Sequence, residues 1–198
     1  MSSQSLYRNL LKTCFICTAL ASAAVCAKQE TPSGSEAATI ARGLYLVNIG
    51  GCGDCHTLKL FTEAGPEPDK SRLLSGYPAN KKLPSVPSGV IGPEQWGAIA
   101  TNDLTAWAGP WGVSYAANLT PDATGLGSWT PEIFIRAIRN GKIAGNGRPI
   151  LPPMPWMDYA LMTDEDLRAV FAYLKSLPPV SNVVPSPLPA VAAPAPGN

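Results

Sequence analysis

The chain has 198 residues, with 15 lysines and arginines, 14 aspartates and glutamates, and one histidine, so its formal net charge is +1. This balance argues against a nucleic-acid-binding domain, because such domains carry strong basic patches. The length suits a single domain with an adequate core, and no fixed-period repeat indicates a solenoid. The 21 prolines and 18 glycines predict that much of the chain is loop.

Residues 1–27 have the pattern of a secretory signal peptide. Arg8 and Lys12 precede an apolar run that ends in Val-Cys-Ala at position 27. The run is short for a membrane span, which needs roughly 20 apolar residues, but an uncleaved anchor and a lipid-modified Cys26 are alternatives. Cleavage would leave 13 basic and 14 acidic residues and two of the five cysteines. We therefore expect an exported, periplasmic protein, with possible membrane association.

A helix is predicted after a polar leader at residues 28–34. It begins near Ser33, where Ser-Gly-Ser-Glu matches the capping box. Apolar residues follow at helical spacing, and Gly50-Gly51 end the helix. The chain then passes directly into residues 52–56.

Residues 52–56 read Cys-Gly-Asp-Cys-His and contain the only histidine. Cys-x-x-Cys-His is the attachment signature of c-type haem, in which two cysteine sulfurs bond the vinyl groups and the imidazole binds iron. A structural zinc site would need four Cys or His ligands, and a thioredoxin-like pair would not need His56. The sequence therefore predicts one covalent haem c on Cys52 and Cys55, with His56 as an axial ligand and no thiol left for a disulfide.

The stretch from 60 to 110 is interrupted by prolines, which break any long helix. We expect short turns and one hairpin there. In it, residues 98–101 or 104–107 pair with residues 112–117 around Gly109-Pro110.

Two further helices are predicted. The first has Thr130 as its cap, Pro131 at its first position and Asn140-Gly141 at its end. The second starts at Thr163, repeats apolar residues at i, i+3, i+4 and i+7, and ends before Pro178. From Pro185 the chain is mostly Pro, Ala and Val without charged side chains, which predicts a mobile, disordered tail over 185–198.

A haem iron held by one histidine needs a sixth ligand or remains open to small molecules. The predicted mature chain offers three methionines as thioether ligands. Met154 lies among prolines that fix the backbone and pre-organise its loop, whereas Met157 lacks this bracket. Met162 stands before the cap at Thr163, where it forms a hydrophobic staple with Leu167. The sequence favours Met154, with Met157 as the alternative.

The chain resembles class I c-type cytochromes over residues 36–184, because its first helix runs into Cys-Gly-Asp-Cys-His and a Pro-flanked Met154 precedes its last helix. The pieces Asn-Leu-Thr-Pro-Asp at 118–122 and Thr-Gly-Leu-Gly-Ser-Trp-Thr at 124–130 are similar to cytochrome domains of periplasmic dehydrogenases and respiratory complexes. The resemblance implies a mainly α domain over 35–184, with three or more helices around one haem and a long loop and hairpin insertion.

The resemblance also implies that the first and last helices cross beside the haem, with Gly43 and Tyr173 near the crossing. Many relatives carry two or three haems, but this chain has one motif, so a relay between haems is not carried over. The stretch from His56 to Met154 is longer than in small carriers of the class.

Three residues are candidate partners of the haem propionates, because indole, guanidinium and amide groups all donate hydrogen bonds. They are Trp129, Arg136 and Asn118. Alternatively, Trp129 belongs to the core, Arg136 is solvated and Asn118 caps a turn.

These features predict a periplasmic one-electron carrier with iron bound by His56 and Met154 and with no catalytic residue. Its partners would be redox proteins. One alternative is an electron-transfer subunit of a membrane respiratory or dehydrogenase complex. In that case exposed tryptophans would include interface residues, unless they cover the haem; the candidates are Trp96, Trp107, Trp111 and Trp156. A haem enzyme is the weaker alternative, because no second histidine exists to move protons.

Overall fold

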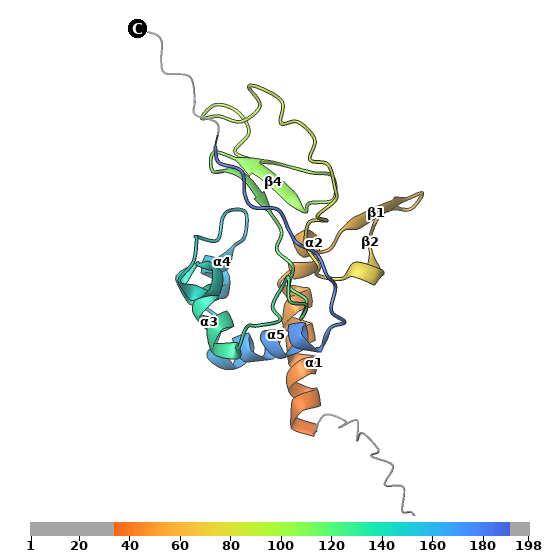
Figure 1. Ribbon diagram of the computed structural model, residues 1–198, viewed down its shortest axis with the longest axis vertical. Helices are drawn as coiled ribbons and strands as arrows, with labels where there is room; N and C mark the ends of the chain where they lie inside the picture. Colours follow the sequence, from red (N-terminus) through yellow and green to blue (C-terminus); the bar gives the residue numbers. More distant parts are fainter. Residues whose placement is uncertain (1–33, 191–198) are drawn as a thin grey trace, which may run out of the picture. The chain divides into compact units, whose positions relative to one another are not determined.

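The computed structural model describes residues 34–190, and this range contains five α-helices and five short strands (Figure 1). The helices are α1 (Gly34–Ile49), α2 (Cys52–His56), α3 (Pro131–Asn140), α4 (Trp156–Tyr159) and α5 (Asp164–Ser176). The strands are β1 (Lys59–Thr62), β2 (Gly65–Pro68), β3 (Ile99–Ala100), β4 (Ala106–Gly109) and β5 (Gly112–Tyr115). The expected signal peptide at 1–27 and the expected cap at Ser33 lie outside the described residues.

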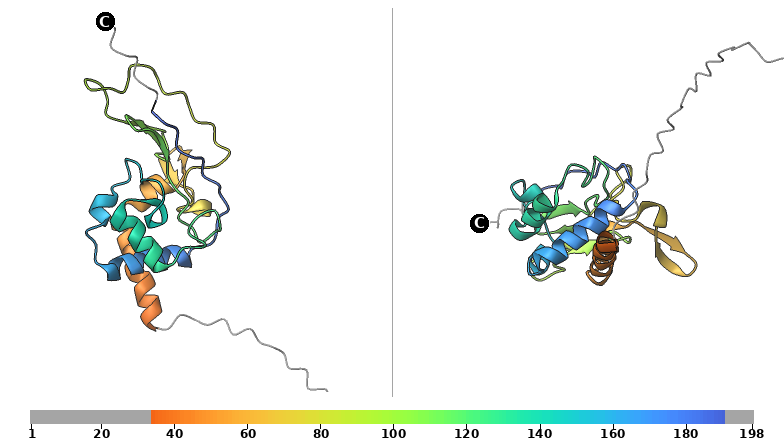
Figure 2. Two further views of the ribbon diagram at one scale, coloured as in Figure 1. Left: turned by 60° about the vertical axis from the view of Figure 1, so that its left-hand side comes forward. Right: turned by 90° about the horizontal axis from the view of Figure 1, so that it is seen from below.

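Helices α1 and α5 cross in direct contact (Figures 1 and 2). Gly43 makes this approach possible, because a Cβ there would lie 1.9 Å from the carbonyl oxygen of Ala169 and 2.7 Å from Cβ of Tyr173. The close approach of the first and last helices at Gly43 and Tyr173 is therefore confirmed. It orients α1 so that its end delivers the chain into α2.

The helical core lies between α1, α3 and α5. Its buried members include Leu46, Phe134, Leu167 and Phe171. The predicted helix ends are confirmed, because the Thr130 and Thr163 side chains accept backbone N–H groups of α3 and α5, and Gly141 ends α3 with φ +61°. Local capping and apolar periodicity were enough to place both helices.

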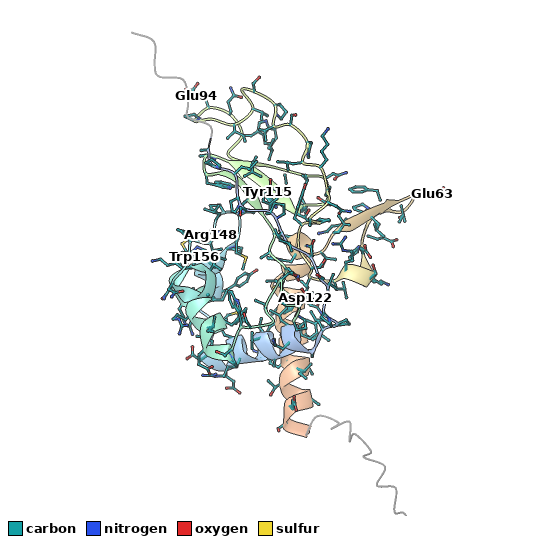
Figure 3. All side chains as sticks on the ribbon, viewed as in Figure 1. Glu63, Glu94, Tyr115, Asp122, Arg148 and Trp156 are labelled. Atoms are coloured by element: carbon teal, nitrogen blue, oxygen red, sulfur yellow. The ribbon has the colours of Figure 1, made fainter. Side chains whose placement is uncertain are left out.

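The expected hairpin is present with shifted bounds. Strand β4 pairs antiparallel with β5 around Gly109-Pro110, and β3 adds a third strand on the far edge of β4. A second hairpin, β1–β2, was not expected; it projects from the domain, with Glu63 at its tip (Figures 1 and 3). Its prolines are tolerated because this two-stranded ribbon has no further strand that needs their N–H groups.

The expected tail from Pro185 is wrong for residues 185–190. Leu188 exchanges two backbone hydrogen bonds with Val113 of β5, at 2.9 and 3.0 Å. A Cβ on Gly112 would lie 2.1 Å from the carbonyl oxygen of Leu188, so the segment packs closely on the strand. Composition indicated mobility, but backbone pairing with a distant strand orders this part. Residues 191–198 lie outside the described range.

Candidate haem-binding site

His56 is buried and held on two sides by backbone groups. Its Nδ1 lies 2.8 Å from the carbonyl oxygen of Ala117, to which it donates, and its own carbonyl accepts the N–H of Gly76 at 2.8 Å. Burial lowers the pKa of His56 below its ordinary value, despite the bond to Ala117. The ring is therefore neutral at neutral pH, and Nε2 keeps a lone pair that can bind iron.

Cys52 and Cys55 lie on the same short helix as His56, and neither forms a disulfide. Burial is the main cause that raises the pKa of Cys52 to about 11, and it also raises the pKa of Cys55. Two free thiols and an imidazole on consecutive turns are the donor set that a covalent haem c requires. The residues present therefore fit this group.

The haem motif is also stabilised by Lys59. The Lys59 ammonium donates to the carbonyl oxygens of Gly53, at 3.2 Å, and of Asp54. These carbonyls lie between the two cysteines and are among the last four of α2, where a cation is favoured. The Gly53 carbonyl also accepts the N–H of Thr57 at 3.2 Å. Lys59 thus places a positive charge beside the haem-binding helix.

Of the three candidate thioether ligands, Met154 and Met162 are half-buried and Met157 is 65% exposed. Met162 packs against the helical core beside Thr163, as the sequence predicted. Met154 lies in the loop 151–155, directly before α4. This arrangement favours Met154 as the sixth ligand, with no competing packing role for its side chain in the helical core.

The Met154 loop is joined to β5, and α4, which follows the loop, is joined to Gly50 just before the motif. The Ser114 hydroxyl donates to the carbonyl oxygen of Pro152, and the Tyr159 hydroxyl donates to the carbonyl oxygen of Gly50. Sequence reasoning did not single out Ser114, Tyr159 or Lys59. No local pattern indicates the contacts of Ser114 and Tyr159, because their partners lie 38 and 109 residues away in the chain.

The three propionate candidates differ in the structure. Asn118 is buried and fully used: its amide donates to Thr124 and to the carbonyl of Val180, while its carbonyl oxygen accepts from Thr120. It therefore fixes the turn before Pro121, as the alternative predicted. Arg136 is exposed. Trp129 is half-buried and packs against the helical core, and its indole N–H makes no hydrogen bond to the described residues.

The tryptophans that sequence analysis considered as interface or haem-covering residues have unlike environments. Trp96 is 68% exposed. The indole N–H of Trp107 donates to the carbonyl of Leu104, and that of Trp111 donates to Ser114. Trp156 is the first residue of α4 (Figure 3), and its ring covers Gly141 at the end of α3. Of these four side chains, Trp96 therefore offers the largest free surface.

No helix among residues 34–190 is long and apolar enough to cross a bilayer.

No family model matches the chain. The chain is 32% identical over 137 residues to the gluconate 2-dehydrogenase cytochrome c subunit of Pantoea cypripedii, in an alignment covering 69% of this chain and 22% of that protein. It is 29% identical over 147 residues to the fructose dehydrogenase cytochrome subunit of Gluconobacter japonicus, covering 74% and 23%. It is 29% identical over 168 residues to the cytochrome c subunit of a quinone-dependent alcohol dehydrogenase of Gluconacetobacter polyoxogenes, covering 83% and 27%. The chain spans less than a third of the length of these relatives.

Proposed function

We propose that this chain, a homologue of the cytochrome c subunits of dehydrogenases, is a class I cytochrome that transfers single electrons through one covalently bound haem c. The observation that carries the proposal is the site around α2, where two free thiols and a neutral, backbone-anchored His56 lie together. The haem would supply a reversible one-electron couple at its iron.

The residues of the chain would hold the haem and keep its iron closed. Cys52 and Cys55 would attach the group covalently, and His56 and Met154 would bind its iron. Trp129 is the remaining candidate for contact with the haem, through an indole N–H that has no partner among residues 34–190. With the iron bound by both side chains, substrate would have no site on it, and the chain would transfer electrons without catalysing bond chemistry.

We propose that the chain works with a dehydrogenase rather than alone. The relatives are named as cytochrome subunits of gluconate, fructose and alcohol dehydrogenases, which supports a subunit role over a free carrier. Export directed by residues 1–27 would place the chain in the periplasm. Copurification from native membranes with a dehydrogenase that reduces it would support the subunit role; isolation as a soluble protein alone would favour the free carrier.

Intact-mass spectrometry of the exported protein tests the cofactor. We expect a chain that lacks residues 1–27, carries one haem and has no thiol that reacts with iodoacetamide. A mass without haem, or with two haems, would contradict the proposal. Retention of residues 1–27 with one haem would change the anchoring but leave the haem assignment intact.

A further inference from the structure

The loop that carries Met154 is closed at both ends by side-chain hydroxyls. Ser114 lies on β5 and donates to the carbonyl oxygen of Pro152, while its oxygen accepts the indole N–H of Trp111 at 3.3 Å. Tyr159 ends α4 and donates to the carbonyl oxygen of Gly50. Met154 thus lies between two anchored residues, Pro152 and Tyr159, that are close to it in sequence.

The partners of Pro152 and Tyr159 in these bonds, Ser114 and Gly50, belong to segments that also position the haem motif. Ser114 precedes Ala117, the acceptor of His56 Nδ1, by three residues on the same strand and its extension. Gly50 precedes Cys52 by two residues. A Cβ on Gly50 would lie 3.5 Å from Cε1 of Tyr159 and 3.8 Å from Sγ of Cys52, so the tyrosine ring and the Cys52 sulfur both approach Gly50.

We propose that Ser114 and Tyr159 are positioning residues that hold the Met154 loop closed and thereby set how strongly the iron resists foreign ligands. The inference rests on the proposed ligation by Met154. An external ligand can replace this thioether only when the loop moves away, and that movement breaks one or both hydrogen bonds. The two hydroxyls therefore act on ligand exchange without touching the iron.

A merely structural role makes a different prediction. The domain contains matched hydrogen bonds away from the loop: Tyr77 donates its hydroxyl to the carbonyl of Lys81 at 2.8 Å, and Ser176 donates to the carbonyl of Tyr173 at 2.7 Å. If Ser114 and Tyr159 only stabilise the fold, their removal should resemble the removal of these bonds. If they hold the loop closed, they should differ from these controls in ligand exchange.

The test is a titration of the ferric holoprotein with imidazole, followed by absorption. We expect Tyr159→Phe and Ser114→Ala each to tighten imidazole binding about threefold to tenfold, the range that corresponds to the net free energy of one hydrogen bond. The double variant should bind more tightly than either single variant. Tyr77→Phe and Ser176→Ala should bind as the parent does, and Ser114→Thr, which keeps the hydroxyl, should restore parental binding.

The outcomes separate this inference from the proposed function. Parental imidazole affinity in both Tyr159→Phe and Ser114→Ala, in a protein that shows methionine ligation, overturns the inference and leaves the function standing. Equal tightening in the Tyr77→Phe and Ser176→Ala controls also overturns it, because the effect would then follow general stability. A parent protein without methionine ligation overturns the sixth-ligand assignment, and the inference falls with it.

Discussion

The two sides of the haem motif are held in different ways. On the His56 side, the ring and its own peptide carbonyl are fixed by backbone groups of Ala117 and Gly76, and the ring is buried. On the other side, the half-buried Met154 is held through its loop by two side-chain hydroxyls. Of the two proposed iron ligands, His56 is therefore part of the folded core, whereas Met154 is attached to the core by hydrogen bonds that single substitutions can remove.

The His56 side also contains a buried polar cluster. The Asp103 carboxylate is 1% exposed and pairs with Lys81, and Asn182 donates to the carbonyls of Ser75 and Tyr77, the residues that flank Gly76. Burial opposes ionisation of Asp103, but bonds from Lys81 and Thr101 outweigh it and leave the pKa of this carboxyl below its usual range. Changes on this side should therefore cost folding stability, while changes on the Met154 side should cost ligation.

The largest effect is expected from a change that disrupts the α1–α5 crossing, which both sides share. Gly43→Leu should prevent folding at 25 °C, because a side chain there meets the backbone of Ala169, which cannot move without separating α1 from α5. Urea unfolding, followed by circular dichroism, measures the loss of folding stability. Gly34→Ala, at the start of α1 with open space around it, is the control and should unfold as the parent does.

The next largest effect is expected from a substitution that affects the His56 side alone. Lys81→Met should destabilise the domain by about 2 to 3 kcal/mol at pH 7, since it leaves the Asp103 carboxylate buried without its partner. The pKa of Asp103 is lowered in the parent, so its contribution is present above the unfolded pKa and is lost as pH falls through the lower, folded pKa.

The variant should therefore approach the parent in stability near pH 4, where protonation neutralises the unpaired Asp103. Urea midpoints at pH 7 and pH 4 measure this change. The control is Lys82→Met, which makes the same substitution at the exposed residue next to Lys81. A deficit that stays constant over this range would show that the loss comes from packing and not from charge.

A change on the Met154 side should leave the fold intact. Met154→Ala should open the iron, so that the reduced protein binds carbon monoxide rapidly while its urea midpoint shifts by less than that of Lys81→Met. Stopped-flow mixing with carbon monoxide measures this. Rapid binding by the parent protein itself would show that the iron is already open and would favour a haem enzyme.

A smaller effect concerns Lys59, which belongs to neither axial side. Lys59→Gln should lower the reduction potential, because a positive charge beside the haem disfavours the ferric state. Lys59→Arg should keep most of the parental reduction potential. Lys82→Gln, at an exposed position, should leave the potential unchanged. Potentiometric titration decides; an unchanged potential in Lys59→Gln would restrict Lys59 to capping α2.

The sequence was sufficient for the features that depend on local patterns. Caps at Thr130 and Thr163, the apolar repeats of α3 and α5, and the spacing of residues 52–56 all appear within one or two helical turns. It was insufficient where a segment depends on a distant partner. The tail expectation failed at Leu188, which pairs with Val113, and no local pattern shows that Asn182 joins Ser75 across 107 residues.

For the site, residue type and spacing identified the motif cysteines and His56 as candidates, and the structure brings them together on α2. Proline context favoured Met154, and the exposure of Met157 supports the same choice. The sequence could not reveal Ser114 and Tyr159, because a hydroxyl that bonds a remote carbonyl leaves no periodic signal. Asn118 was correctly considered as a turn residue, and its bonds to Thr120, Thr124 and Val180 explain why.

Closure of the iron by His56 and Met154 is the property on which the proposed electron transfer depends. The most direct measurement is the near-infrared and red absorption of the ferric protein, where an iron–sulfur charge-transfer band reports a thioether ligand. We expect the band in the parent and in Met157→Ala, and its loss in Met154→Ala. Loss of the band in Met157→Ala alone, or its absence from the parent protein, would contradict closure by Met154.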